Sequence, residues 1–296
     1  MKKISFLISI LLAQIGFCQN YQSEFLNYCQ TKDTLNQLKV LEEWKKSSPN
    51  DPELFTSYFN YHFSKSRKEV IALTTNQPNG ESLTLKDSLN KTAGFLGSQI
   101  HYDQTELRKG LEKIDEGITS YPNRLDMRFG KIYALGQIAD WNNFTSEIVK
   151  TIKYSSTNDN NWTWTNNEKK NGTEKDFLLD IQTYQLQLYN TGNDELLKNM
   201  REIANEVLKY YPNHIESLSN LSITYLLTKE YEKALEPLLK AEKLAPKDPI
   251  VLANIAQAYK LKGEKQKSIE YYEKTIEFGD KRTQEYAKQQ IIELKK

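Results

Sequence analysis

Residues 215–248 read IESLSNLSITYLLTKEYEKALEPLLKAEKLAPKD, and residues 249–280 read PIVLANIAQAYKLKGEKQKSIEYYEKTIEFGD. The two stretches carry one pattern at a spacing of 34 residues, in which large, small and amide side chains recur at matching places. The matched pairs are Leu218 and Leu252, Leu221 and Ile255, Ser222 and Ala256, Tyr225 and Tyr259, Ala234 and Ser268, Leu238 and Tyr272, and Asn220 and Asn254. A fixed period of this length is typical of stacked helical hairpins.

The unit resembles the tetratricopeptide repeat (TPR), whose helix–turn–helix motif has the same length. Large residues stand at positions 4, 7, 11 and 24, small residues at 8 and 20, and Pro246 at 32. The small residues let the two helices of a unit cross closely. The resemblance implies an all-α, TPR-like solenoid of helical hairpins, wound as a right-handed superhelix.

Four prolines that follow helical stretches extend this frame along the chain: Pro49, Pro122, Pro212 and Pro246. The last two are one unit apart, whereas the wider spacings before them imply two insertions. We therefore expect degenerate TPR-like repeats over residues 19–154 and 175–212. Two clear units should occupy residues 213–280, and an amphipathic helix over 281–296 should cap the open end of the stack.

The first insertion, at about residues 65–104, has the pattern of a β-hairpin. Apolar residues 70–73 and 83–85 flank a turn at residues 78–80, which predicts two short strands. Residues 87–102 contain Gly94 and Gly97 and are predicted to be irregular or partly helical.

The second insertion, residues 155–174, consists almost wholly of Ser, Thr, Asn and Lys and is predicted to be a polar loop. Trp162 and Trp164 are its large aromatics. If they are exposed, they could stack on a sugar ring or contact a protein partner. The alternative is that the loop folds back and inserts both rings between repeats.

The N-terminus reads as a secretory signal peptide over residues 1–18. Lys2 and Lys3 precede an apolar run from Ile4 to Ala13 that is too short to span a bilayer, and no later stretch approaches that length. The expected product is exported to the periplasm or beyond the cell. Lipid anchoring through Cys18 is the competing interpretation, although bulky Phe17 precedes it.

The charge balance and cysteine content exclude some classes of protein. The chain has 40 basic and 39 acidic residues and a formal net charge of +1, which argues against a nucleic-acid partner. If Cys18 leaves with the signal, only Cys29 remains, and no intrachain disulfide can form.

No catalytic or metal motif is present in the sequence. His62, His101 and His214 lie far apart without cysteines or paired carboxylates at ligand spacing. Phosphate loops, nucleophile elbows and metalloprotease helices are absent as well. The sequence therefore predicts no cofactor and no enzyme.

In the family that the repeats resemble, the first helix of each unit forms a concave wall. The resemblance implies that Ser219, Asn220, Ile223, Asn254, Gln257 and Lys260 lie on it. Asn220 and Asn254 stand out because a carboxamide both donates and accepts hydrogen bonds and can bracket a peptide backbone. Each could instead tie adjacent helices together. The Lys and Arg of a carboxylate-clamping groove are not at their positions, which hold Glu216, Ser219, Ile250 and Ala253.

These observations favour an exported, non-catalytic scaffold that binds a peptide or protein in its concave groove. The alternative is a carbohydrate-binding accessory protein of the cell envelope, which would use the two loop tryptophans.

Overall fold

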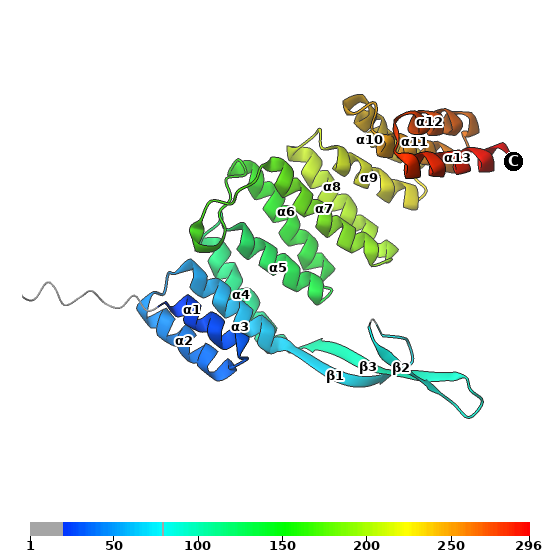
Figure 1. Cartoon of the computed structure of the whole chain (residues 1–296). Helices are drawn as coiled ribbons and strands as arrows, with labels where there is room; N and C mark the ends of the chain where they lie inside the picture. Colours follow the sequence, from blue (N-terminus) through cyan, green and yellow to red (C-terminus); the bar gives the residue numbers. More distant parts are fainter. Residues whose placement is uncertain (1–19, 79) are drawn as a thin grey trace, which may run out of the picture. The chain divides into compact units, whose positions relative to one another are not determined.

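The computed structural model describes residues 20–78 and 80–296 (Figure 1). The chain forms two compact units, one reaching to Pro122 and including residues 165–167, the other comprising 123–164 and 168–296. The predicted signal peptide lies outside the described residues. Within the described part, no helix has both the length and the hydrophobicity that a membrane crossing requires.

The helices of the first unit begin at well-defined caps. The side chains of Asp33, Asp51 and Asp103 each accept a hydrogen bond from a backbone N–H of the following turn, which satisfies donors that have no partner in the helix. Trp44 and its apolar neighbours are buried between the helices, and each such burial contributes about 1.5–3 kcal/mol. The helices are α1 (Tyr21–Gln30), α2 (Thr34–Ser47), α3 (Pro52–Ser66) and α4 (Gln104–Ser120).

Between α3 and α4 lies a three-stranded antiparallel sheet in the order β1-β3-β2. Its strands are β1 (Arg67–Thr74), β2 (Ser82–Lys86) and β3 (Thr92–Tyr102). The two predicted strands are present as β1 and β2, but they do not pair with each other as the predicted hairpin, because β3 lies between them. The prediction of irregular or partly helical structure over residues 87–102 is wrong for the same reason. That segment turns at Asp87, whose carboxylate accepts from the N–H groups of Leu89 and Lys91, and then forms the central strand.

The two glycines of β3 mark close approaches rather than a flexible turn. Because β1 and β2 flank β3, the β1–β2 connection must cross β3, and it does so over Gly97. A Cβ atom there would lie 2.8 Å from Pro78 Cγ, and one on Gly94 would lie 2.9 Å from the Thr74 carbonyl oxygen. Glycine inside a strand is often placed by such contacts.

The second unit is an array of helical hairpins. Two short 3₁₀ segments lie in the connections that follow α6 and α7. They are Thr165–Asn167, which is counted with the first unit, and Asp194–Leu196. The helices are α5 (Leu125–Gln137), α6 (Trp141–Thr157), α7 (Glu174–Asn190), α8 (Leu197–Tyr210), α9 (Ile215–Leu227), α10 (Tyr231–Leu244), α11 (Pro249–Lys262), α12 (Lys265–Phe278) and α13 (Lys281–Lys295). The chain is thus mostly helical, a TPR-like hairpin array with a small sheet inserted.

Small residues lie where the paired helices meet. Ser222 and Ala234 of the α9–α10 pair are fully buried. In the next pair, the Ser268 hydroxyl donates to the Ala256 carbonyl oxygen at 2.8 Å. A larger side chain at any of these places would push the helices apart.

Helix α13 covers the last pair. Ala287 and Ile291 of α13 pack in one apolar cluster with Ile269 and Tyr272 of α12. Polar contacts reach α11 as well, because Lys260 Nζ donates to Gln290 Oε1 at 2.6 Å and forms an ion pair with Glu293 at 3.1 Å.

Candidate functional site

A groove of about 590 Å³ lies over helices α7, α9 and α11 of the second unit. These are the first helices of three successive hairpins. Large apolar side chains line the groove and remain substantially exposed, with exposed fractions of 62% for Leu179, 56% for Leu186 and 66% for Ile250. We call this surface the groove.

Helical periodicity explains why these residues share one surface. On α7, Leu179, Gln182 and Leu186 follow at spacings of three and four residues, which places them on one side of the helix. A second apolar stripe, which includes Phe177 and Ile181, is buried on the other side. Helix α7 thus packs through one stripe and presents the other.

Four of the six predicted groove residues line the groove: Ser219, Asn220, Ile223 and Asn254. Gln257 and Lys260 do not line it. Gln257 Oε1 accepts from the Tyr272 hydroxyl at 2.9 Å, and Lys260 is held by α13. Helix α13 therefore engages the end of α11 that would otherwise extend the wall.

The two asparagines of the repeat differ in their partners. Asn220 Nδ2 donates to Gln182 Oε1 of α7, so this carboxamide ties adjacent helices, which was the alternative interpretation of the pair. Gln182 Nε2 in turn lies 3.3 Å from Ser217 Oγ. Asn254 is half-buried and has no hydrogen-bond partner within residues 20–78 and 80–296.

Gln185 of α7 lines the groove and is buried beneath its surface. It is 1% exposed, and neither its Nε2 nor its Oε1 has a partner among the described residues. A buried carboxamide without partners is unfavourable by about 1–3 kcal/mol. Sequence reasoning missed Gln185 and the other α7 residues because α7 belongs to a degenerate repeat. The two apolar stripes of α7 are the feature of the sequence that could have predicted its place in the groove, because a helix buries only one of them.

The groove is apolar with acidic groups at its border. Glu216 and Asp248 line it, and no Lys or Arg of the described part does so. Asp248 also caps α11 by accepting from the N–H groups of Ile250 and Val251. Glu216 lies 3.1 Å from His214, where burial lowers the imidazole pKa against the opposing attraction of the carboxylate. His214 is therefore neutral near pH 7 and leaves the Glu216 charge uncompensated.

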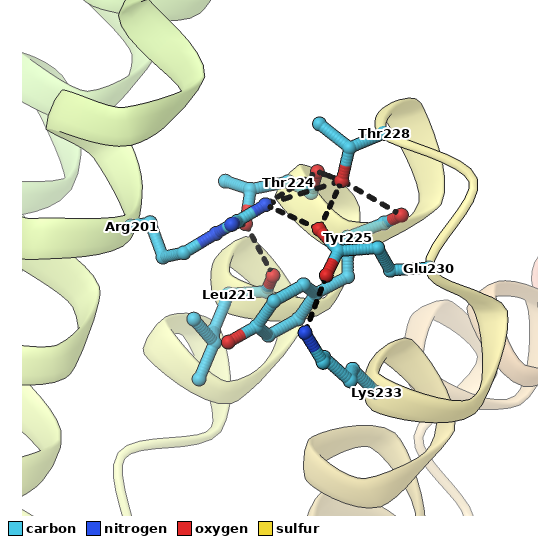
Figure 2. A network of polar contacts seen from close by, with 7 residues as sticks. All are labelled: Arg201, Leu221, Thr224, Tyr225, Thr228, Glu230 and Lys233. Carbon is cyan, nitrogen blue, oxygen red and sulfur yellow. Dashed lines mark hydrogen bonds and ion pairs between the residues drawn. The ribbon is translucent and has the colours of Figure 1, made fainter.

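Helix α9, which carries the centre of the groove, is fixed to its neighbours at its C-terminal end (Figure 2). Arg201 of α8 donates to the Thr224 hydroxyl at 3.2 Å and to the Thr224 carbonyl oxygen at 3.3 Å. Its guanidinium also lies 4.1 Å from the centre of the Tyr225 ring and 3.4 Å from Glu230. These contacts satisfy helix-end carbonyls and hold α8 and α9 in register.

The structure places the two loop tryptophans differently. Trp162 is 3% exposed and stacks on Phe177 with ring centres 5.6 Å apart, so the exposure on which a surface contact would depend is absent for this ring. The loop has enough neighbouring apolar surface on α7 to bury the ring, as the alternative interpretation held. Trp164 is 37% exposed and packs edge-on against Phe129, with Lys170 over its ring.

No group of three or more His, Cys, Asp or Glu residues in the described part could hold a metal ion. Burial raises the pKa of the Cys29 thiol, which makes it a poor nucleophile.

Comparisons with known proteins identify one family model and several solved structures that are similar to this chain. Residues 250–278 match the family model of the tetratricopeptide repeat. The chain is similar to the crystal structure of YrrB, a TPR protein with an unusual peptide-binding site, at 12% identity over 84% of this chain and 97% of that chain, with a TM-score of 0.42. It is also similar to the C-terminal part of a TPR repeat-containing protein from Cytophaga hutchinsonii, at 12% identity over 87% and 78% of the two chains, with a TM-score of 0.41.

A third similar structure is the Sgt2 TPR domain from Aspergillus fumigatus, at 21% identity over 38% of this chain and 80% of that chain, with a TM-score of 0.32. No curated protein sequence matches this chain.

Proposed function

We propose that this chain, a TPR repeat protein built as an array of helical hairpins, is a non-catalytic scaffold that binds an apolar peptide segment of a partner protein in the groove. One observation carries the proposal: three successive first helices line a single concave surface, to which α7 and α11 present exposed aliphatic side chains and α9 contributes half-buried Ile223 and the carboxamide of Asn220. Apolar grooves with a few placed polar groups are the usual form of a peptide site.

Binding would draw on the apolar area that remains exposed. Leu179, Leu186 and Ile250 are each between 56% and 66% exposed, so covering each one contributes about 1–2 kcal/mol. The costs of association and side-chain ordering offset part of this sum. These three side chains by themselves therefore account for a weak affinity, of roughly millimolar Kd, and any tighter binding must come from the other residues of the groove.

The acidic residues at the border of the groove favour a partner peptide segment that carries basic residues. With Glu216 and Asp248 lining the groove and no basic lining residue in the described part, a terminal carboxylate has no cation to bind. A segment with Leu or Ile at helical spacing and Lys or Arg at its flanks fits this pattern. Asn254 is available to the segment's polar groups, and Asn220 would have to exchange its bond to Gln182.

The test uses a fluorescent, C-terminally amidated peptide with leucines at helical spacing and lysine flanks, beside the same peptide with glutamate flanks. Anisotropy should show the lysine form binding wild type at least several-fold more tightly. Leu186→Glu should abolish this binding. A matched control on the second helix of a hairpin, Glu236→Ala with Lys243→Ala, should bind as wild type, because both residues are exposed on α10 and lie outside the groove.

Equal binding by wild type and Leu186→Glu would contradict the proposed site. Equal binding of both peptides would remove the charge argument. Cross-linking in the native cells, compared between wild type and an Asn220→Ala, Asn254→Ala variant, then identifies the natural partner as the protein lost from the variant.

Export is part of the same proposal and rests on the sequence of residues 1–18, where two lysines precede an apolar run. Cell fractionation and the mass of the purified N-terminal peptide test it. A chain beginning at Gln19 supports signal cleavage, a diacylglyceryl-modified Cys18 supports anchoring, and an intact Met1 in the cytoplasm would contradict export.

A further inference from the structure

One face of the three-stranded sheet carries aliphatic side chains from every strand. Residues that pair directly across antiparallel strands share a face, and Leu73 pairs with Leu96, which pairs with Leu83, so a row of leucines crosses the sheet. Alternation along each strand adds three more residues to this face. We call the six residues the aliphatic face: Ile71, Leu73, Leu83, Leu85, Leu96 and Ile100.

The opposite face differs in composition and in cover. It carries the apolar residues Val70, Ala72 and Phe95 beside polar ones such as Thr84 and Gln99. The β1–β2 connection crosses this face, with Pro78 lying against Gly97. The chain therefore covers the more polar face of its own sheet and leaves the aliphatic one bare.

The described residues do not cover the aliphatic face. Its six members are between 36% and 79% exposed, Ile71 the most. Figure 1 shows the sheet extending away from the ends of α3 and α4. A three-stranded sheet normally packs one face on a core, and a contiguous exposed patch of this kind marks an interaction surface.

We propose that a second copy of this chain covers the aliphatic face, with two sheets packed face to face about a two-fold axis. In such an interface the same surface meets itself, so any net charge on it would repel. The charged residues on this face are Arg67 and Glu69, which lie 3.8 Å apart and sum to zero. Glu69 also accepts from the Ser98 hydroxyl at 2.5 Å.

The balance of charge also favours a second copy over an anionic lipid surface. Membrane binding by an amphipathic face usually uses a one-sided group of basic residues. Here Lys68 lies on the opposite face, where it bonds to Asp103 at 3.2 Å. Among the described residues of β1 that lie on the same side as the aliphatic face, Arg67 is the basic one, and Glu69 balances its charge.

The size of the sheet is consistent with a weak, specific dimer. At about 3.4 Å per residue and 4.8 Å between strands, the sheet covers roughly 400 Å² in plane. Side chains standing on it have a larger accessible area, so two copies bury on the order of 1,000 Å², the lower limit for a specific interface. Sheets packed in this way lie about 10 Å apart.

Sedimentation velocity of the full chain from about 1 to 300 µM should show reversible dimers at the upper end. A double variant, Ile71→Lys with Leu83→Lys, places like charges against one another in the interface and should weaken association at least about 100-fold. The matched control is Val70→Lys with Thr84→Lys, which adds the same charge to the same strands on the opposite face. It should associate as wild type. Circular dichroism spectra that match the wild type show that each variant is folded.

A cross-linking experiment tests the geometry without altering charge. Leu96→Cys lies in the central row, and oxidation should link two copies through it, whereas Gln99→Cys on the opposite face should give only the background of the existing cysteines. A wild-type chain that stays monomeric throughout, or equal association of both lysine variants, would overturn the proposal. Monomers that float with liposomes through the same face would assign it to lipid instead.

Discussion

The groove of the second unit and the aliphatic face of the first both expose leucine and isoleucine, yet they differ in shape and in polar content. Ile250 in the groove and Ile71 on the sheet are 66% and 79% exposed. The groove is concave, has carboxamides and acidic groups along it, and rests on a buried stripe of α7. The aliphatic face of the sheet carries no carboxamide, and the sheet extends away from the ends of α3 and α4 (Figure 1). The difference in polar groups therefore indicates a peptide for the groove and a matching aliphatic surface for the sheet.

The largest expected effect separates the two sides of α7. Ile181 is fully buried behind the groove, and Ile181→Ala should lower the free energy of unfolding by about 2–5 kcal/mol. Leu179→Ala, on the groove side, should cost below about 1 kcal/mol but weaken peptide binding. Urea unfolding and anisotropy measure the two quantities. Equal destabilisation by both variants would show that the groove stripe is structural.

The sheet has its own sensitive position at Gly97. Gly97→Val introduces a Cβ 2.8 Å from Pro78 Cγ, so the crossing connection must move, at a cost of about 1–3 kcal/mol. Hydrogen exchange should accelerate in β2 and β3 while the amides of α9 to α12 keep their protection. Unchanged exchange in the strands would contradict the close crossing.

A substitution at Gln185 tests whether its buried carboxamide lowers the stability of the fold. Gln185→Met removes a buried carboxamide with no partner among the described residues and keeps its approximate volume. The free energy of unfolding should therefore rise by about 1 kcal/mol. Thermal unfolding measures the change, with Gln182→Met as the control, since Gln182 is hydrogen bonded and its loss should destabilise. A less stable Gln185→Met would show that the amide is in use.

A smaller, pH-dependent effect is expected where α3 and α4 join the sheet. A hydrogen bond from His62, at 2.8 Å, together with Lys109 and Lys65, lowers the pKa of Glu106 to about 2. An unfolded chain would titrate near 4.3, so this stabilisation is present above that pH and is lost as the pH falls towards 2. Glu106→Gln should flatten the acid limb of the stability curve. An unchanged limb would exclude this carboxylate as its source.

The two clear repeats made much of the second unit predictable. Ser219, Asn220, Ile223 and Asn254 line the groove because each unit repeats the same helical positions. The α7 residues were not predicted because their repeat is degenerate. Gln257 and Lys260 do not line the groove, because Tyr272 of α12 engages the first and α13 engages the second, and the repeat period does not reveal such contacts.

The helical hairpins of the last two repeat units and the small residues at their crossings could be predicted from the amino-acid sequence. They follow from side-chain spacing along each helix and from the recurrence of one pattern after 34 residues. Only the tertiary structure decided that residues 92–102 form a central strand, that Trp162 lies against Phe177, and that one sheet face stays bare. Those outcomes depend on contacts between residues distant in sequence, such as Pro78 on Gly97, which leave no period to read.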